Sequence, residues 1–189
     1  MSEIDPTLVQ EFNVAAVLGR MGEHEKSLSA YRELLSHVTE PHGLTASPHF
    51  IAVARLRVGF CLMDLERYAE AEVEFASVMP LVSFMPIEDR YELYFAYGNT
   101  LGRLGRLQEM FNQLLNAVTA AEDMEDYTQR PEACWVQILM HAERAKGWSF
   151  LKEKATIALN NARLRGMDRL GRFAGAMLDR ARSNAQLVN

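Results

Sequence analysis

The sequence lacks the residue patterns that mark a disulfide-stabilised protein, a structural zinc protein or a membrane protein. Its two cysteines, Cys61 and Cys134, are too few for a disulfide framework or for a complete structural zinc site. The longest apolar stretch, residues 78–87, is broken by Pro80 and Pro86 and is too short to span a bilayer. No basic and apolar signal segment opens the chain, so we expect a cytoplasmic protein with no membrane contact.

Motifs of catalysis and metal binding are also lacking. The chain has no glycine-rich phosphate loop, nucleophile elbow, Cys-x-x-Cys pair or His-Glu-x-x-His motif. We therefore predict a protein that is not an enzyme and needs no cofactor. His37, His42 and His49 gather around one polar linker beside Glu40, but an exposed linker favours solvated histidines, and we predict no metal site.

What the 189 residues do contain is helical periodicity interrupted at regular intervals. Asp5-Pro6 and Ser47-Pro48 each place an N-cap acceptor before a proline at the first helical position, and Pro86 and Pro131 indicate further helix starts. The breaks between paired helices centre on Gly22, Glu66, Gly105 and Gly147, at intervals of 44, 39 and 42 residues. This spacing predicts a repeat of helical hairpins.

The second repeat unit carries a recognisable set of residues, namely a small Gly59, the turn aromatic Tyr68, then Ala71 and Phe75. With these residues the chain resembles the tetratricopeptide (TPR) family. The third unit matches at Tyr94, Gly98, Leu101, Gly105 and Ala117, and the first at Gly22 and Tyr31, with Ser27 in place of the usual alanine. In the fourth, Ala155, Leu159 and Ala162 have the right mutual spacing but lie three residues late relative to Gly147.

The resemblance implies an all-α, right-handed α-solenoid of four hairpins and a C-terminal capping helix. The intervals exceed the usual period of about 34 residues, and in this the chain resembles long-period members such as kinesin light chains and bacterial peptide-sensing regulators. We expect one domain over residues 1–189, with hairpins at about 6–39, 48–80, 86–123 and 131–165 and the capping helix at about 168–184.

The family's working surface is a concave groove lined by the first helix of each hairpin. Some members hold a carboxylate there with lysine and asparagine, but only Asn99 and Arg103 resemble such a clamp. A groove with an apolar middle and a few polar groups suits an extended or helical peptide. Carried over position by position, the predicted groove residues are Phe12, Arg20, Leu56, Phe60, Met63, Asp64, Phe95, Asn99, Arg103, His141 and Arg144. The alternative is that its aromatic members are interhelical core.

Charge is distributed unevenly along the chain. Residues 1–143 hold 10 basic and 22 acidic side chains, and residues 144–189 hold 10 basic and 3 acidic ones, so the net charge of −5 combines −12 and +7. The basic end could dock an acidic partner, the two ends could attract in head-to-tail self-association, or arginines could simply solvate the last helices. We do not expect nucleic acid, because no base-stacking aromatics are interleaved with the arginines.

The resemblance thus implies a non-catalytic adaptor or scaffold that binds a peptide or protein partner in the groove. Two alternatives remain open: a structural homo-oligomer assembled through the charged ends or the apolar linker 79–87, and a chaperone-like or regulatory module that sequesters a client segment. That linker, with Met79 and Met85, either folds onto the neighbouring hairpin or marks an interface.

Overall fold

A computed structural model describes residues 4–39, 44–127 and 129–185. Over these residues the chain forms nine α-helices and one 3-10 helix and has no strand, which confirms the all-α helical-repeat solenoid. The chain divides into two compact units, Met1–Leu93 and Tyr94–Asn189, and each is described by itself. The organisation of the hairpins into one domain stays a prediction.

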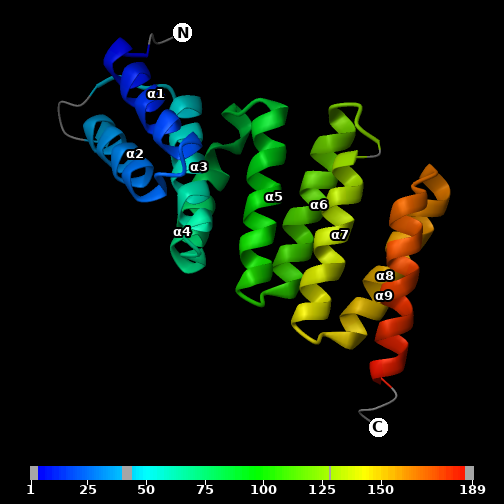
Figure 1. Cartoon of the computed structure of the whole chain (residues 1–189). Helices are drawn as coiled ribbons and strands as arrows, with labels where there is room; N and C mark the ends of the chain where they lie inside the picture. Colours follow the sequence, from blue (N-terminus) through cyan, green and yellow to red (C-terminus); the bar gives the residue numbers. More distant parts are fainter. Residues whose placement is uncertain (1–3, 40–43, 128, 186–189) are drawn as a thin grey trace. The chain divides into compact units, whose positions relative to one another are not determined.

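Unit 1 contains two antiparallel helical hairpins, seen in blue to cyan in Figure 1. Helix α1 packs on α2, α2 on α3, and α3 on α4. A small core links the first three helices through Leu8, Leu34 and Ala54, with Phe12 and Phe50 packed against it. The elements are α1 (Pro6–Arg20), α2 (His24–Thr39), α3 (Pro48–Asp64), α4 (Tyr68–Val78), the 3-10 helix η1 (Met79–Phe84) and the first part of α5 (Ile87–Arg103).

The predicted proline starts hold for both hairpins of unit 1. The Asp5 carboxylate accepts a hydrogen bond of 2.8 Å from the Thr7 backbone N–H, and Ser47 Oγ accepts one of 3.1 Å from Phe50 N–H. Each cap satisfies a donor that the first turn leaves open, a contribution of about 1 kcal/mol.

Unit 2 contains the rest of α5 followed by four helices, seen in green to red in Figure 1. Helix α6 packs on α7, α7 on α8, and α9 on both α8 and α7. Pro131 does not start a helix as predicted, because the Asp126 carboxylate accepts from the N–H groups of Gln129 and Arg130 and the helix begins earlier. The helices are α6 (Leu107–Asp123), α7 (Gln129–Arg144), α8 (Trp148–Arg165) and α9 (Asp168–Ala185).

The hairpin turns share one residue in the left-handed backbone region. In the first three hairpins it is the predicted turn residue, with φ of 78° at Gly22, 59° at Glu66 and 76° at Gly105. In the fourth it is Lys146, at φ 53°, and not Gly147. When each unit is numbered from its left-handed turn residue, Ala155 of the fourth unit falls at the position of Phe75 in the second unit and not at that of Ala71. This alignment corrects the register of the fourth unit.

That register gives a paired position in the seam of the second, third and fourth hairpins. A Cβ added to Gly59 would lie 2.3 Å from the Phe75 ring, so the glycine makes room for the aromatic side chain. Gly98 makes room for Leu114 in the same way. The fourth hairpin reverses the sizes, with Leu139 on the first helix and Ala155 on the second, both fully buried. The seam requires a suitable combined volume of the two paired side chains, and does not require one residue type at either position.

The apolar linker folds onto its own unit. Residues 79–84 form η1, which packs on α3 and α4, and Met85 is buried. The Met85 carbonyl accepts a 2.8 Å hydrogen bond from Arg90 Nε, which fixes the segment before α5. Phe84 keeps 57% of its surface exposed, so the linker is covered only in part.

A membrane-spanning helix is not found among the residues that the structure describes, since none of their helices combines the necessary length and apolarity.

Candidate functional site

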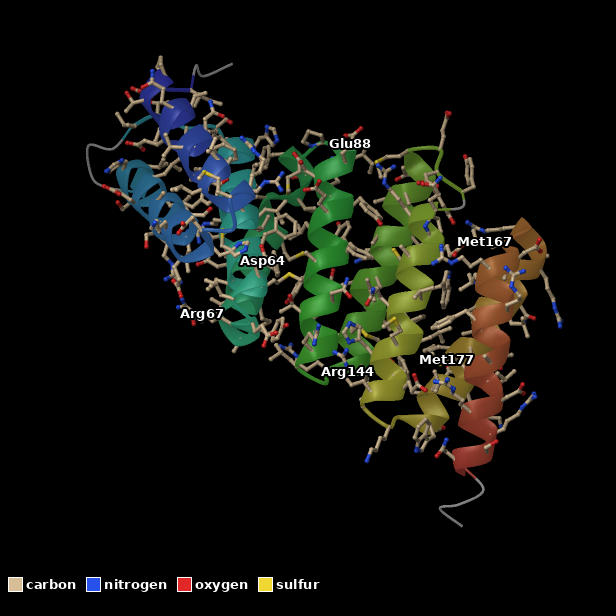
Figure 2. The ribbon with its side chains drawn as sticks, in the orientation of Figure 1. Asp64, Arg67, Glu88, Arg144, Met167 and Met177 are labelled. Carbon is tan, nitrogen blue, oxygen red and sulfur yellow. The ribbon has the colours of Figure 1, made fainter. Side chains whose placement is uncertain are left out.

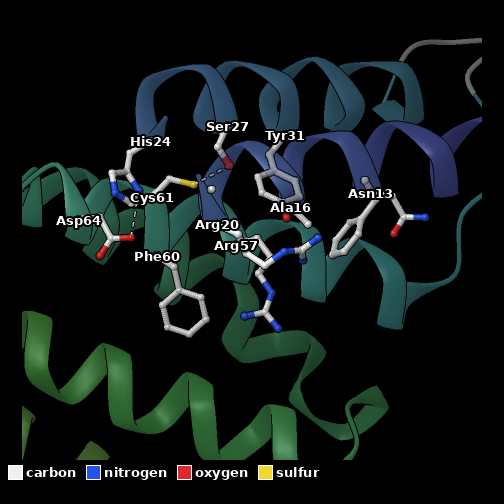
Figure 3. Close-up of a pocket in the computed structure, with 12 residues that line it drawn as sticks. Asn13, Ala16, Arg20, His24, Ser27, Tyr31, Arg57, Phe60, Cys61 and Asp64 are labelled. Atoms are coloured by element: carbon white, nitrogen blue, oxygen red, sulfur yellow. Dashed lines mark hydrogen bonds and ion pairs between the residues drawn. The ribbon is translucent and has the colours of Figure 1, made fainter. Parts of the chain in front are cut away.

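A hollow of about 480 Å³ opens between α1, α2 and α3 of unit 1 (Figure 3). Four of the predicted groove residues line it, namely Phe12, Arg20, Phe60 and Asp64. We call it the unit 1 pocket. Its other lining residues are Asn13, Ala16, Gly19, His24, Ser27, Tyr31, Arg57 and Cys61.

Aromatic rings form the apolar part of the unit 1 pocket. The Phe12 and Tyr31 rings meet edge to face, with centroids 5.2 Å apart, and Phe60 contacts Phe75 at 6.1 Å. Burial raises the pKa of Tyr31 to about 12, so its hydroxyl stays a hydrogen-bond donor at neutral pH. The rings are held by the hairpin core and present rigid apolar surface to the pocket.

Two arginines, Arg20 and Arg57, line this pocket (Figure 3). Arg57 lies over the Phe60 ring, 5.3 Å from its centroid, and its Nη1 is 3.3 Å from Glu92 Oε2. Arg20, exposed at the last turn of α1, forms no ion pair within the described part of the chain. One positive charge is thus available to a ligand, and a second in the same pocket is already oriented.

The opposite side of the pocket carries a histidine and a carboxylate. His24 Nδ1 lies 3.2 Å from Asp64 Oδ2, at the end of α3, where Figure 2 labels Asp64. Behind them the Cys61 thiol donates to Ser27 Oγ at 3.3 Å, and Ser27 donates to the Ala15 carbonyl at 2.8 Å. Burial raises the pKa of Cys61, so the thiol has little thiolate character and fills space between helices.

The prediction that Leu56 is a groove residue was wrong. Leu56 is completely buried and belongs to the core. Met63 is half-buried and does not line the pocket. The predicted set of groove residues also lacked His24 and Tyr31. It was taken from the first helix of each hairpin, and both of these residues lie on the second.

Unit 2 brings together a second group of predicted residues. Asn99 Nδ2 donates to the Phe95 carbonyl at 2.8 Å, which leaves Asn99 Oδ1 to accept from His141 Nε2 at 3.1 Å. The neutral His141 ring therefore carries its proton on Nε2. A Cβ on Gly102 would lie 2.4 Å from the His141 ring, so this glycine creates the space that the imidazole fills.

His141 is a core residue and not an open groove contact, because only 4% of its surface is exposed. Its pKa is lowered to about 4, first by burial and then by the positive charges of Arg144 and Arg103. Its Nδ1 is buried without a hydrogen-bond partner. Arg103 and Arg144 themselves are exposed, each at the end of its helix, and Figure 2 labels Arg144.

The arginines of the basic C-terminal region mostly serve unit 2 itself. Arg165 pairs with Glu122, Arg169 Nε lies 3.4 Å from Glu132, and Arg180 Nη1 lies 2.6 Å from Glu143. These pairs join α8 to α6 and α9 to α7. Much of the +7 charge is therefore matched within the unit.

The clustered histidines separate into carboxylate pairs. His37 Nδ1 lies 3.1 Å from Glu11 and His49 Nε2 lies 3.1 Å from Asp89, while His42 and Glu40 lie outside the described residues. Across residues 4–39, 44–127 and 129–185, no group of three or more potential metal ligands is found.

Comparison with solved structures shows a TPR-like fold. Neither a family model nor a curated protein sequence matches the chain. A kinesin light chain-like protein of TPR-like repeats from Podosopora anserina aligns with TM-score 0.67 and 13% identity over 95% of this chain and 87% of that one. MamA from Desulfovibrio magneticus RS-1 aligns with TM-score 0.61 and 13% identity over 97% and 98%. A Rap protein complexed with Competence and Sporulation Factor aligns with TM-score 0.52 and 16% identity over 92% and 51%.

Proposed function

We propose that this TPR-like chain is a non-catalytic interaction module that binds a peptide segment of a partner through the unit 1 pocket. The observation that supports it most is that Arg20 and Arg57 both line a hollow with aromatic walls. A structural neighbour, the Rap protein, was solved in complex with Competence and Sporulation Factor, which supports a ligand-holding role for this fold.

The chemistry of the pocket selects for an acidic side chain next to an apolar one. Arg20 supplies a guanidinium that forms no ion pair with the described residues, the Tyr31 hydroxyl supplies a further donor, and Phe12 and Phe60 supply apolar surface. An aspartate or glutamate would pair with Arg20, and a neighbouring leucine or phenylalanine would pack on the rings. Because the rings and Arg57 are already held by intramolecular contacts, little side-chain entropy is lost when the peptide binds.

Unit 2 offers a second polar contact of its own. Arg103 and Arg144 are exposed near the Asn99–His141 hydrogen bond, so this cluster also favours an anionic group. His141 acts there by holding Asn99 in place and not by contacting the peptide.

The test is fluorescence anisotropy with labelled peptide pools of equal length. One pool has aspartate or glutamate beside leucine or phenylalanine, the second replaces the acidic residue with lysine, and the third replaces it with asparagine or glutamine. We expect the acidic pool to bind most tightly. Loss of one charge-assisted hydrogen bond in Arg20→Ala should weaken that binding by about 10- to 100-fold.

Arg32→Ala, which removes an arginine on α2 outside the pocket, is the matched control and should bind as the unmodified chain does. Equal binding of the three pools, or an acidic-pool affinity unaffected by Arg20→Ala, would show that the pocket assignment is wrong.

A further inference from the structure

The first hairpin exposes an apolar surface on the side of α1 and α2 away from the unit 1 pocket. Between the two helices lies a groove of about 380 Å³ whose lining includes Glu11, Glu33 and Val14. Val14 is 58% exposed, Val17 continues the strip along α1 at 43%, and Met21, which follows the end of α1, is 71% exposed. We call this surface the acidic end face; its groove is lined by Gln10, Glu11, Val14, Ala30, Glu33 and Leu34.

Such a strip is unusual on a helix of a folded unit. Residues 14, 17 and 21 recur at helical spacing, which is the pattern that normally packs against a neighbouring helix. In a helical repeat, each hairpin buries its apolar face against the next one, and an end hairpin without a polar outer face leaves that surface open. The acidic end face therefore has the character of a stacking surface.

The last two helices expose a groove of the opposite charge. Between α8 and α9 lies a groove of about 250 Å³ that contains Arg163 and Arg172. Its apolar part comes from Leu159, Ala162 and Met167, the last of which Figure 2 labels at the α8–α9 turn. We call this surface the basic end face; Asp168 and Gly171 complete its lining.

Arg163 and Arg172 differ from the other arginines of these helices. Arg165, Arg169 and Arg180 pair with glutamates of α6 and α7. Arg163 and Arg172 are exposed and form no ion pair with any residue that the structure describes.

We propose that the basic end face of one copy docks on the acidic end face of a second copy, giving head-to-tail self-association. The groove of the acidic end face contains the carboxylates Glu11 and Glu33, and the groove of the basic end face contains the guanidinium groups of Arg163 and Arg172 together with the carboxylate Asp168. The occupant is therefore a second copy of this chain, which supplies both complementary surfaces. Because the two faces are different, the contact is heterologous, and each copy keeps one face free for a further copy.

The experiment uses two variants of the whole chain, each blocked on one face. Val14→Glu with Glu33→Arg blocks the acidic end face, and Arg163→Glu with Arg172→Glu blocks the basic one. Sedimentation velocity over a range of concentrations at low salt should show the unmodified chain associating, and each variant alone remaining monomeric or associating at least tenfold more weakly. Added salt should weaken association of the unmodified chain, since the facing charges are screened.

Mixing the two blocked variants is the decisive measurement. Each retains one intact face, so the mixture should form a one-to-one heterodimer that does not grow further. Glu88→Arg reverses an exposed charge outside both faces and should associate as the unmodified chain does. Circular dichroism confirms that all variants fold. A monomer at every concentration and salt level, or association unchanged in both blocked variants, would overturn the proposal.

Discussion

The buried His141 should make the stability of the protein depend on pH in a specific direction. Its ring is 4% exposed, its Nε2 donates to Asn99 Oδ1, and the fold lowers its pKa from 6.5 to about 4. A histidine whose pKa is lower in the folded state than in the unfolded state contributes to stability at pH values above its unfolded-state pKa. That stability is lost as pH falls from about 6.5 toward about 4, because protonation of the unfolded chain then competes with folding.

The size of the effect follows from the two pKa values. A difference between 6.5 and about 4, at 1.36 kcal/mol per pKa unit, corresponds to about 3 kcal/mol when the loss is complete. Between pH 7 and pH 5 the unfolded histidine becomes almost fully protonated while the folded one stays neutral, so about 2 kcal/mol should be lost in that interval. This is a large part of the stability of a typical domain.

The assay is urea unfolding followed by far-UV circular dichroism at pH 7 and pH 5, with the unmodified chain and His141→Gln in parallel. The variant will lower stability at pH 7, because it changes a packed ring. The informative quantity is therefore the difference between the two pH values. His24, His37 and His49 are present in both proteins, so their contributions cancel in the comparison.

We expect the free energy of unfolding of His141→Gln to fall by about 2 kcal/mol less between pH 7 and pH 5 than that of the unmodified chain. An equal fall in both proteins would refute the reasoning, since it would mean that His141 titrates alike in the folded and unfolded states. A Gly102→Ala variant, whose added Cβ displaces the ring, should likewise reduce the pH dependence.

Two further predictions concern the hairpin seam and turns. Gly59→Ala should destabilise the fold by about 1–3 kcal/mol in urea unfolding, because the added Cβ collides with Phe75, and Phe75→Leu in the same chain should recover part of the loss. No recovery in the double variant would contradict a local collision. Glu66→Gly and Lys146→Gly should each raise the free energy of unfolding by about 1 kcal/mol, seen as a higher urea midpoint. The reason is that glycine adopts the left-handed turn conformation without the Cβ clash. A loss of stability in both variants would be inconsistent with backbone strain at these turns.

The repeat could be read from the sequence because its signals are local. Asp5 and Ser47 cap helices with their own side chains within three residues, and Gly22 and Gly105 allow a left-handed turn wherever they stand. The periodicity of the apolar positions then determines that the helices are amphipathic and must pair. These signals give the all-α repeat and the TPR-like fold.

The candidate site was only partly predictable because its members come from different helices. Phe12, Arg20, Phe60 and Asp64 were found from the first helices of two hairpins, whereas Tyr31 and His24 reach the pocket from α2. Leu56 shares the helix α3 with Phe60 and has a similar local pattern, yet it lies in the core. Which face of a helix is covered depends on the neighbouring hairpin, and a single sequence does not contain that geometry.

The sequence by itself therefore determined that this protein, with few cysteines and no catalytic motif, is a repeat of helical hairpins. The tertiary structure alone decided how the seams are filled: Gly59 makes room for the Phe75 ring in one hairpin, and Leu139 and Ala155 are both fully buried in another. It also decided which arginines remain available, because long-range pairs such as Arg180–Glu143 neutralise some and leave others exposed. Local patterns fix helices and turns, but volumes and charges are balanced between segments that are distant in the chain, and only folding brings those segments together.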